Sequence, residues 1–322
     1  MISRFFLASL YQTVMYLMKI NIYDLRYDEK ITRLKFFSLF AIARGIRLLI
    51  VASALNQNDH EETTSQMHET PLKNALIMGA SGGIGYAMAE RLATDPGIDT
   101  LVLCSRRALS SPPLLSLQSQ LAAAGKQCWL LDADITDEAS LSALTGRLRK
   151  DLQVIDLIIN TAGLLHSKDL APEKALEHIS LHAMQQVFAV NAYGPILLAQ
   201  SLMPWLKARR PVVFASLSAR VGSIADNRLG GWYSYRASKA AQNQLLKTLA
   251  IELARRNPEA IVLALHPGTT DTGLSRPFQA NVAQEKLFTP AFVAEQLLNQ
   301  IMQATVEDTG SFIAWDGQRI AW

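Results

Sequence analysis

Cysteine is scarce in this chain of 322 residues, which contains only Cys104 and Cys128. Both lie in short apolar runs that are typical of buried strands, TLVLCS and QCWLLD. If these runs form neighbouring parallel strands, Cys104 ends one strand and Cys128 begins the next. A stagger of three or four residues then separates the two thiols by about 10 Å, which is too far for a disulfide. We therefore expect two free thiols in a reducing compartment, and a cytoplasmic protein.

A strong charge of either sign is also missing, since the net charge is +3. Residues 1–55 carry eight Lys and Arg against three Asp and Glu, so the positive excess comes from this segment. The rest of the chain is close to neutral and predicts no nucleic-acid partner. Metal-site spacing is absent as well. His178 and His182 are four residues apart, but the glutamate of a zinc-protease helix does not accompany them, so we expect both on a helix surface.

Residues 1–55 differ from the rest of the chain because they are basic and apolar. Residues 36–55 are long enough to span a bilayer, but Arg44 and Arg47 lie near their middle. Two central arginines cost about 5–7 kcal/mol on the insertion scale, and the surrounding apolar residues return a similar amount. Three interpretations stay open for this extension: a membrane span, a basic amphipathic segment on a membrane surface, or a stretch that the mature protein lacks.

Residues 56–71 are polar and are predicted to be a linker, with Met67 as an alternative start of the protein. From residue 72 the rhythm changes to short apolar runs that alternate with helical segments. We therefore divide the chain into the extension 1–55, the linker 56–71 and one catalytic domain over 72–322. Contact with a membrane is expected, if at all, through residues 1–55.

The domain opens with a strand over residues 74–78, a glycine-rich turn over residues 79–85 and a helix to about Thr94. In this arrangement the backbone N–H groups at the start of the helix can receive a pyrophosphate. The turn is also in the first strand–helix unit of its domain, which is where such a site is usually found. We predict a dinucleotide site at this turn.

Further strand–helix units follow and predict an α/β fold, a doubly wound parallel sheet with helices on both faces. The predicted strands cover residues 74–78, 100–105, 127–132, 155–160, 212–216, 261–266 and 311–315. The predicted helices after the first cover residues 114–124, 137–150, 173–207 and about 235–256. Ligands of such sheets bind at the carboxyl ends of the strands, where Gly79, Asn160, Ser218 and the His266-Pro267-Gly268 turn all lie.

One helix begins with Tyr235 and Lys239, four residues apart and therefore on one face. A lysine cation beside a phenol favours the phenolate and is expected to lower the pKa of Tyr235 toward neutral pH. Ser216 and Ser218, where the preceding strand ends, could bind a substrate oxygen that faces the tyrosine. The spacing alone is weak support, because an exposed Tyr and Lys on a solvated helix would have the same pattern.

Taken together, these motifs resemble those of the short-chain dehydrogenase/reductase family, in the right order over residues 72–322. The family's glycine motif matches Gly79, Gly83 and Gly85, although Met78 replaces its leading threonine. The resemblance implies a Rossmann fold that binds NAD(P). It also implies a set of cofactor-binding residues: Gly79, Ser81, Gly83, Ile84, Gly85, Ser105, Arg106, Asp134, Ile135, Asn160, Ala162, Gly163, Tyr235, Lys239, Pro267, Gly268, Thr270 and Thr272.

The resemblance further implies that Tyr235, Lys239, Ser218 and Asn191 are catalytic, with Asn191 holding a proton-relay water. One spacing departs from the family. Ser218 lies 17 residues before Tyr235, whereas the family's serine lies twelve or thirteen before its tyrosine. The longer segment is similar to that of the C-factor subgroup, and alignment with that subgroup makes Ser218 the catalytic serine rather than Ser216.

The second predicted strand ends in Cys104-Ser105-Arg106-Arg107, where NAD-preferring members of the family carry an acid. A carboxylate would repel a 2′-phosphate, whereas Arg106 offers it a bidentate partner. We therefore favour NADP(H) over NAD(H).

The resulting expectation is an oxidoreductase that transfers a hydride between NADP(H) and a carbonyl or alcohol substrate. In it Tyr235 delivers a proton, Ser218 steadies the substrate oxygen, and Lys239 tunes the tyrosine. The resemblance also implies a homo-oligomer. A second hypothesis is a dinucleotide-binding protein of cell–cell signalling with little turnover. We expect Leu274, Phe278 and Phe288 to form an apolar wall in a substrate lid over residues 269–290.

Overall fold

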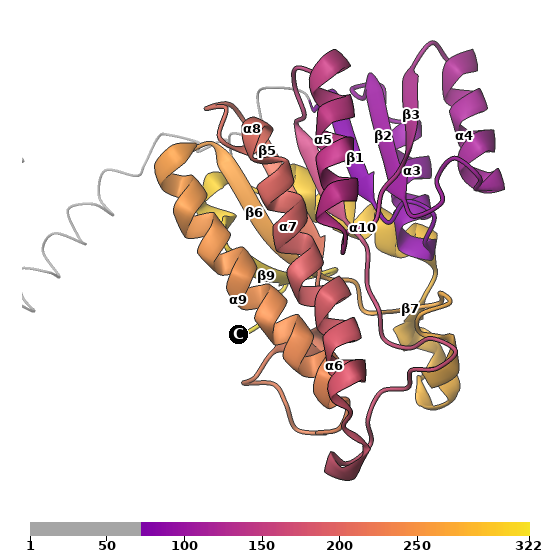
Figure 1. Cartoon of the computed structure of the whole chain (residues 1–322), viewed down its shortest axis with the longest axis vertical. Coiled ribbons are helices and arrows are strands. Elements are labelled where there is room, and N and C mark those ends of the chain that lie inside the picture. Colours follow the sequence, from indigo (N-terminus) through magenta and orange to yellow (C-terminus); the bar gives the residue numbers. More distant parts are fainter. Residues whose placement is uncertain (1–71) are drawn as a thin grey trace, which may run out of the picture. The chain divides into compact units, whose positions relative to one another are not determined.

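The computed structural model describes residues 72–322, so the extension and linker expected before residue 72 lie outside the described residues. The described part forms a parallel sheet of seven strands in the order β3-β2-β1-β4-β5-β6-β9. Figure 1 shows helices on both sides of this sheet. The predicted doubly wound α/β fold is confirmed.

The strand bounds agree with the sequence prediction to within two residues, because each strand is a continuous apolar run. The sheet strands are β1 (Asn74–Met78), β2 (Thr100–Ser105), β3 (Gln127–Asp132), β4 (Leu157–Asn160), β5 (Val212–Leu217), β6 (Ala260–His266) and β9 (Ser311–Ala314). Two short strands, β7 (Thr269–Thr270) and β8 (Leu287–Phe288), pair with each other beyond β6.

The helices are more finely divided than the sequence predicts. They are α3 (Gly83–Ala93), α4 (Pro112–Ala123), α5 (Glu138–Asp151), α6 (Leu181–Phe188), α7 (Gly194–Ser201), α8 (Met203–Leu206), α9 (Tyr233–Arg256) and α10 (Pro290–Gln303). The single helix expected over residues 173–207 is wrong at its start. Ser180 caps α6 by accepting from the Ala183 N–H, so residues 173–180 precede the helix. A π-helical turn over Ala189–Tyr193 then joins α6 to α7.

Alternate residues of each strand supply two separate cores, one on each face of the sheet. On β1, Ala75 and Ile77 pack with α3, α4 and α10, whereas Leu76 and Met78 pack with α5, α7 and α9. The residues of β5 also alternate between the two cores, and Phe214 is fully buried in the core that contains α5, α7 and α9. In Figure 1, α5, α7 and α9 lie in front of the sheet. Both faces are therefore covered, which leaves the carboxyl edge of the sheet for a ligand.

The sheet reverses its strand order between β1 and β4, where Met78 is in register with Asn160. Ligands of open α/β sheets bind in the crevice beside such a reversal. The strand register also shows why the two cysteines form no disulfide. Cys128 on β3 pairs with Leu101 on β2, three residues before Cys104 on the same strand. Both thiols are free, and burial raises their pKa values, that of Cys128 to about 12.

Across residues 72–322, no helix combines the length and the apolar composition needed to cross a bilayer. The stretch for which a span was considered, residues 36–55, lies outside the described residues.

Candidate active site

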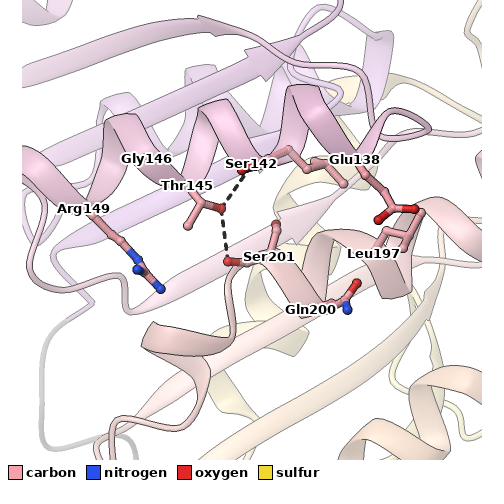
Figure 2. A pocket seen from close by; sticks show the side chains of 9 residues that line it. Glu138, Ser142, Thr145, Gly146, Arg149, Leu197, Gln200 and Ser201 are labelled. Carbon is pink, nitrogen blue, oxygen red and sulfur yellow. Dashed lines mark hydrogen bonds between the residues drawn. The ribbon is translucent and has the colours of Figure 1, made fainter.

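Two of the hollows on the surface of the described part differ in chemistry. The first is a groove of about 410 Å³ between α5 and α7, lined by residues such as Glu138, Arg149 and Gln200 (Figure 2). Two half-buried hydroxyls line it, and both have partners: Thr145 Oγ1 donates to the carbonyl oxygens of Leu141 and Ser201 at 3.0 and 3.1 Å, and Ser201 Oγ donates to that of Leu198 at 2.9 Å. None of the site residues predicted from the sequence lines this groove.

The second hollow, of about 620 Å³, lies at the carboxyl edge of the sheet beside the reversal of strand order. It brings together segments that are far apart in the sequence: the glycine turn, the ends of β2, β3, β4 and β5, the start of α9 and the turn after β6. Of the predicted site residues, it is lined by Gly79, Ser81, Gly83, Ile84, Gly85, Ser105, Arg106, Asp134, Ile135, Ala162, Gly163, Ser218, Tyr235, Lys239, Pro267 and Thr272.

The glycine turn leaves no room for side chains where the backbone must come close to a ligand. Gly79 has a φ of +88°, which favours glycine. A Cβ atom on Gly85 would lie 2.4 Å from the Gly79 carbonyl oxygen, and one on Gly83 would lie 2.7 Å from Thr272 Cγ2. The turn therefore presents bare backbone at the start of α3, as pyrophosphate binding requires. The hydroxyl of Ser105 is buried, lines the cavity and has no partner among the described residues, so it is available to a ligand.

Helix α9 carries Tyr235 and Lys239 on the face that it turns toward the sheet, and both are buried, with 8% and 3% of their surface exposed. Lys239 Nζ lies 6.0 Å from the centroid of the Tyr235 ring. The ammonium donates to the Leu217 carbonyl oxygen and to Gln242 Oε1, each at 2.8 Å. These two acceptors hold the ammonium of Lys239 at the end of β5, in the wall of the cavity.

The expected lowering of the Tyr235 pKa does not occur in this structure. Burial raises the pKa of the phenol, and it also lowers the pKa of Lys239 to about 7. A low-dielectric environment disfavours both charged forms, and at this distance the lysine does not offset the effect on the phenol. Tyr235 is consequently held as the neutral phenol, which is the form of a proton donor.

The two candidate serines have different roles. Ser216 lies within β5, and its hydroxyl accepts from Asn160 Nδ2 at 2.9 Å and from Gln242 Nε2 at 2.8 Å, away from the cavity. Ser218 follows the strand and lines the cavity, where its Oγ donates to Asn243 Oδ1 at 2.6 Å. Of the two serines, only Ser218 lines the cavity that Tyr235 also lines.

The extra residues between Ser218 and Tyr235 do not separate them, because they fold away from the cavity. The backbone N–H of Arg220 donates to His266 Nδ1 at 3.2 Å, and burial lowers the pKa of that histidine to about 4. Further along, the Ala225 N–H donates to the carbonyl oxygen of the last residue, Trp322, at 3.1 Å. The insertion is thus anchored to β6 and to the end of the chain.

Four predicted site residues lie behind the cavity wall rather than in it: Asn160, Asn191, Gly268 and Thr270. Asn191 is fully buried in the π-helical turn, where it bonds both backbone groups of Leu164 at 2.8 Å and Ser238 Oγ at 3.1 Å. Gly268 has a φ of +73° and packs so closely on Phe288 that a Cβ atom would lie 2.7 Å from that ring. These residues support the wall.

Three residues that the sequence analysis did not single out support the site: Gln242, Asn243 and Trp232. Gln242 and Asn243 are the polar partners of Lys239 and Ser218, and the signal for them was their spacing from Tyr235 on one helix face. Trp232 packs edge-on against Tyr235 and Phe278, with ring centroids 6.2 and 5.1 Å apart.

Of the residues expected to form an apolar wall, Leu274 and Phe278 pack against the same cluster as Tyr235, and Leu274 lines the cavity. Phe288 differs, because its ring packs at a tilt against that of Trp315, with the ring centroids 4.6 Å apart, beside the core that contains α3, α4 and α10. Phe288 lies on β8 and does not line the cavity.

Asp134 and Arg106 lie on the part of the cavity beyond the glycine turn. Burial alone would raise the pKa of Asp134, but two hydrogen bonds from Thr136 and the charge of Arg106 outweigh it and lower the pKa. Arg106 and Arg107 are both exposed at the end of β2. This end of the cavity therefore carries two guanidinium groups beside one carboxylate.

The family described as short chain dehydrogenase matches residues 73–283. This chain belongs to that family. It is a dehydrogenase or reductase that uses a nicotinamide dinucleotide on a small-molecule substrate, and the residues present fit that cofactor: a bare glycine turn, a free Ser105 hydroxyl and a cavity at the reversal of strand order.

Its similarity to known dehydrogenases extends over most of the described residues. The 1-hydroxy-2-glutathionyl-2-methyl-3-butene dehydrogenase of Rhodococcus is 28% identical over 251 residues, 78% of this chain and 100% of that protein. The C-signal protein of Myxococcus xanthus is 29% identical over 169 residues, 52% of this chain and 93% of that protein, which partly supports the C-factor subgroup. Among solved structures, the NADPH-bound carbonyl reductase from chicken fatty liver has a TM-score of 0.68 at 24% identity, covering 78% of this chain and 99% of that one.

Proposed function

We propose that this dehydrogenase is an NADP(H)-dependent carbonyl reductase in which Tyr235 is the proton donor. The observation that carries the proposal is a buried phenol, kept neutral by its raised pKa, that lines the same cavity as Ser218 and the glycine turn. When bound, the nicotinamide supplies or accepts the hydride. The residues of the chain then have to bind the substrate oxygen and exchange one proton with it.

Tyr235 donates its phenolic proton to the carbonyl oxygen as that oxygen gains negative charge, and takes the proton back in the oxidative direction. Burial favours the protonated phenol, so the resting protein is prepared for reduction. Ser218 donates at 2.6 Å to Asn243 Oδ1, and to steady the same substrate oxygen it has to turn this one hydroxyl proton toward the substrate. Lys239 has a pKa near neutrality and lines the same cavity, so its proton is available to restore the phenol.

The preference for NADP(H) is supported by charge at the end of β2. Arg106 and Arg107 line the cavity there, next to the free hydroxyl of Ser105, and the strand end carries no acid of its own. A 2′-phosphate would gain a charged hydrogen bond at this place, whereas the hydroxyl of NAD(H) would gain much less. Two of the solved relatives from Burkholderia, with TM-scores of 0.65 and 0.62, have NADP bound.

The test is a turnover screen of aldehydes, ketones and quinones with NADPH, followed by Tyr235→Phe with the best substrate. We expect the variant to keep its affinity for NADPH and to lose about two to four orders of magnitude in kcat, the usual worth of a positioned acid. Tyr233→Phe is the matched control, because Tyr233 lies two residues earlier on α9 and is 40% exposed. A Tyr235→Phe variant with wild-type kcat would refute the mechanism.

The signalling hypothesis is less well supported. A protein that only binds the dinucleotide needs the glycine turn and Lys239, but it has no need of Tyr235 and Ser218 in the same cavity.

A further inference from the structure

Helix α9 lacks an N-terminal cap of its own, although its catalytic tyrosine lies in its first turn. Trp232 occupies the cap position with φ and ψ of 53° and 45°, and its side chain accepts no hydrogen bond from the helix. Helix N-termini leave four backbone N–H groups without partners inside the helix. The N–H groups next to Tyr235 therefore have to be satisfied from elsewhere in the chain.

Glu173 supplies these partners from the loop between β4 and α6, 61 residues earlier than Ser234. Its carbonyl oxygen accepts from the Trp232 N–H at 2.5 Å. One carboxylate oxygen accepts from the Ser234 N–H at 3.1 Å, and the other accepts from the Ser234 hydroxyl. A single residue thus binds the two positions that flank the first residue of α9.

Burying a carboxylate is costly unless it is hydrogen-bonded, and Glu173 is only 4% exposed. No lysine or arginine of the described residues forms an ion pair with it. The positive end of the α9 dipole is the favourable electrostatic partner that remains, and it stabilises an anion in the first turn. The charge of Glu173 is therefore coupled to the position of this helix end.

The same loop also reaches α9 one turn further on, which fixes the backbone on both sides of Tyr235. Leu164 bonds the side chain of Asn191, and Asn191 Nδ2 donates to Ser238 Oγ at 3.1 Å. Ser238 in turn donates to the Tyr235 carbonyl oxygen at 2.8 Å. Of these two attachments, the one through Glu173 carries a charge and acts directly on the residue before Tyr235.

We infer that Glu173 is a positioning residue for the reaction proposed above, holding the first turn of α9 so that Tyr235 meets the substrate oxygen. It touches neither substrate nor cofactor, since it does not line the cavity. A displacement of about 1 Å in a catalytic group can cost about 100-fold in rate. The glycine turn belongs to other elements, and Lys239, which is expected to bind the cofactor from α9, is held separately by the Leu217 carbonyl oxygen at the end of β5. Loss of Glu173 should therefore lower kcat and leave NADPH binding unchanged.

The experiment compares the wild type with Glu173→Gln in the full chain, using NADPH and the carbonyl compound that the wild type reduces fastest. We expect kcat per NADPH-binding site to fall by about 10- to 100-fold, with the Kd for NADPH within about twofold of the wild type. Glu177→Gln, in the same loop but exposed, is the matched control and should keep the wild-type kcat. Ser234→Ala removes one of the three bonds and should give a smaller loss.

Hydrogen exchange gives a second readout that does not depend on turnover. The backbone N–H groups of residues 232–236 should exchange faster in Glu173→Gln than in the wild type, while those in the second half of α9 should not change. The inference is overturned if Glu173→Gln keeps the wild-type kcat and exchange, or if it loses NADPH affinity and kcat together. A wild type that binds NADPH but reduces no carbonyl compound would instead overturn the proposed function, and the exchange result would still decide the role of Glu173.

Discussion

Replacing Lys239 by methionine tests whether the active site carries a buried charge at the expense of stability. The ammonium is 3% exposed, and its partners, the Leu217 carbonyl oxygen and Gln242 Oε1, are both uncharged. Burial therefore disfavours the charged form and lowers the pKa of Lys239 from 10.5 to about 7. Methionine has a similar length and no charge, so the variant removes this cost together with two hydrogen bonds.

The magnitude follows from linkage between proton binding and folding. A pKa that falls from 10.5 to about 7 corresponds to about 5 kcal/mol against folding at pH values below 7, where the lysine is charged in both states. Between the two pKa values the unfolded chain binds more protons, so this cost decreases as the pH rises. At about pH 9 the cost of burying the lysine is about 2 kcal/mol. At this pH the lysine is neutral in the folded protein and charged in the unfolded chain, so folding has to remove only its proton.

The assay is urea unfolding of the wild type and Lys239→Met, without added cofactor, from about pH 6 to about pH 9. The free energy of unfolding of the variant minus that of the wild type should fall by about 3 kcal/mol over this range. The two lost hydrogen bonds shift the difference by a constant amount and leave its slope unchanged. Lys207→Met, which replaces an exposed lysine, is the control. A difference that stays constant or grows with pH would refute the buried-charge argument.

Two further predictions concern the cofactor and the start of the protein. Arg106→Ala should weaken NADPH binding by about 1.5–3 kcal/mol, the range for a charged hydrogen bond, and leave NADH binding nearly unchanged; titrations with both cofactors check this, and equal losses would contradict it. A protein that starts at Met67 should fold and be as active as the full chain. The start of β1 is held by a residue of the same domain, because the Asp156 carboxylate accepts from the Lys73 and Asn74 N–H groups at 3.0 and 2.9 Å. Circular dichroism and turnover check it, and a truncated protein that does not fold would show that residues 1–66 pack against the sheet.

The fold could be predicted because the strands are buried on both faces and therefore read as continuous apolar runs. Strand β2 was predicted with its observed bounds, Thr100–Ser105. The order of the strands in the sheet was not predicted, and the structure places the reversal beside the glycine turn. The helices between β4 and β5 could not be divided correctly. Their first part, from Glu173, is rich in helix-forming residues, but its backbone is held by contacts with α9 that lie far away in the sequence.

The site was predicted as a set of positions, but its electrostatics were not. Sequence spacing places Tyr235 and Lys239 on one helix face, and the structure brings both into the cavity with Ser218. Spacing does not reveal burial, which here decides the direction of both pKa shifts and reverses the expected one for the phenol. It also does not reveal which serine lines the cavity, whereas the structure shows Ser218 there and Ser216 bonded to Asn160 and Gln242 behind it.

The two halves of helix α9 bury different kinds of side chain, polar ones in the first half and leucines in the second. Its last turns bury leucines such as Leu249 and Leu253 against the sheet, where burial of apolar surface stabilises the fold. Its first turns bury Ser234, Ser238, Lys239, Gln242 and Asn243, whose polar groups all need partners to offset the loss of water. Glu173, Asn191 and the end of β5 supply most of those partners. Ser238 and Lys239 also bond within α9, and Asn243 Nδ2 has no partner among the described residues. The half that carries Tyr235 is therefore fixed largely by neighbouring elements. A substitution in any of these neighbours should therefore affect the reaction more than the stability, whereas one in the leucine half should do the reverse.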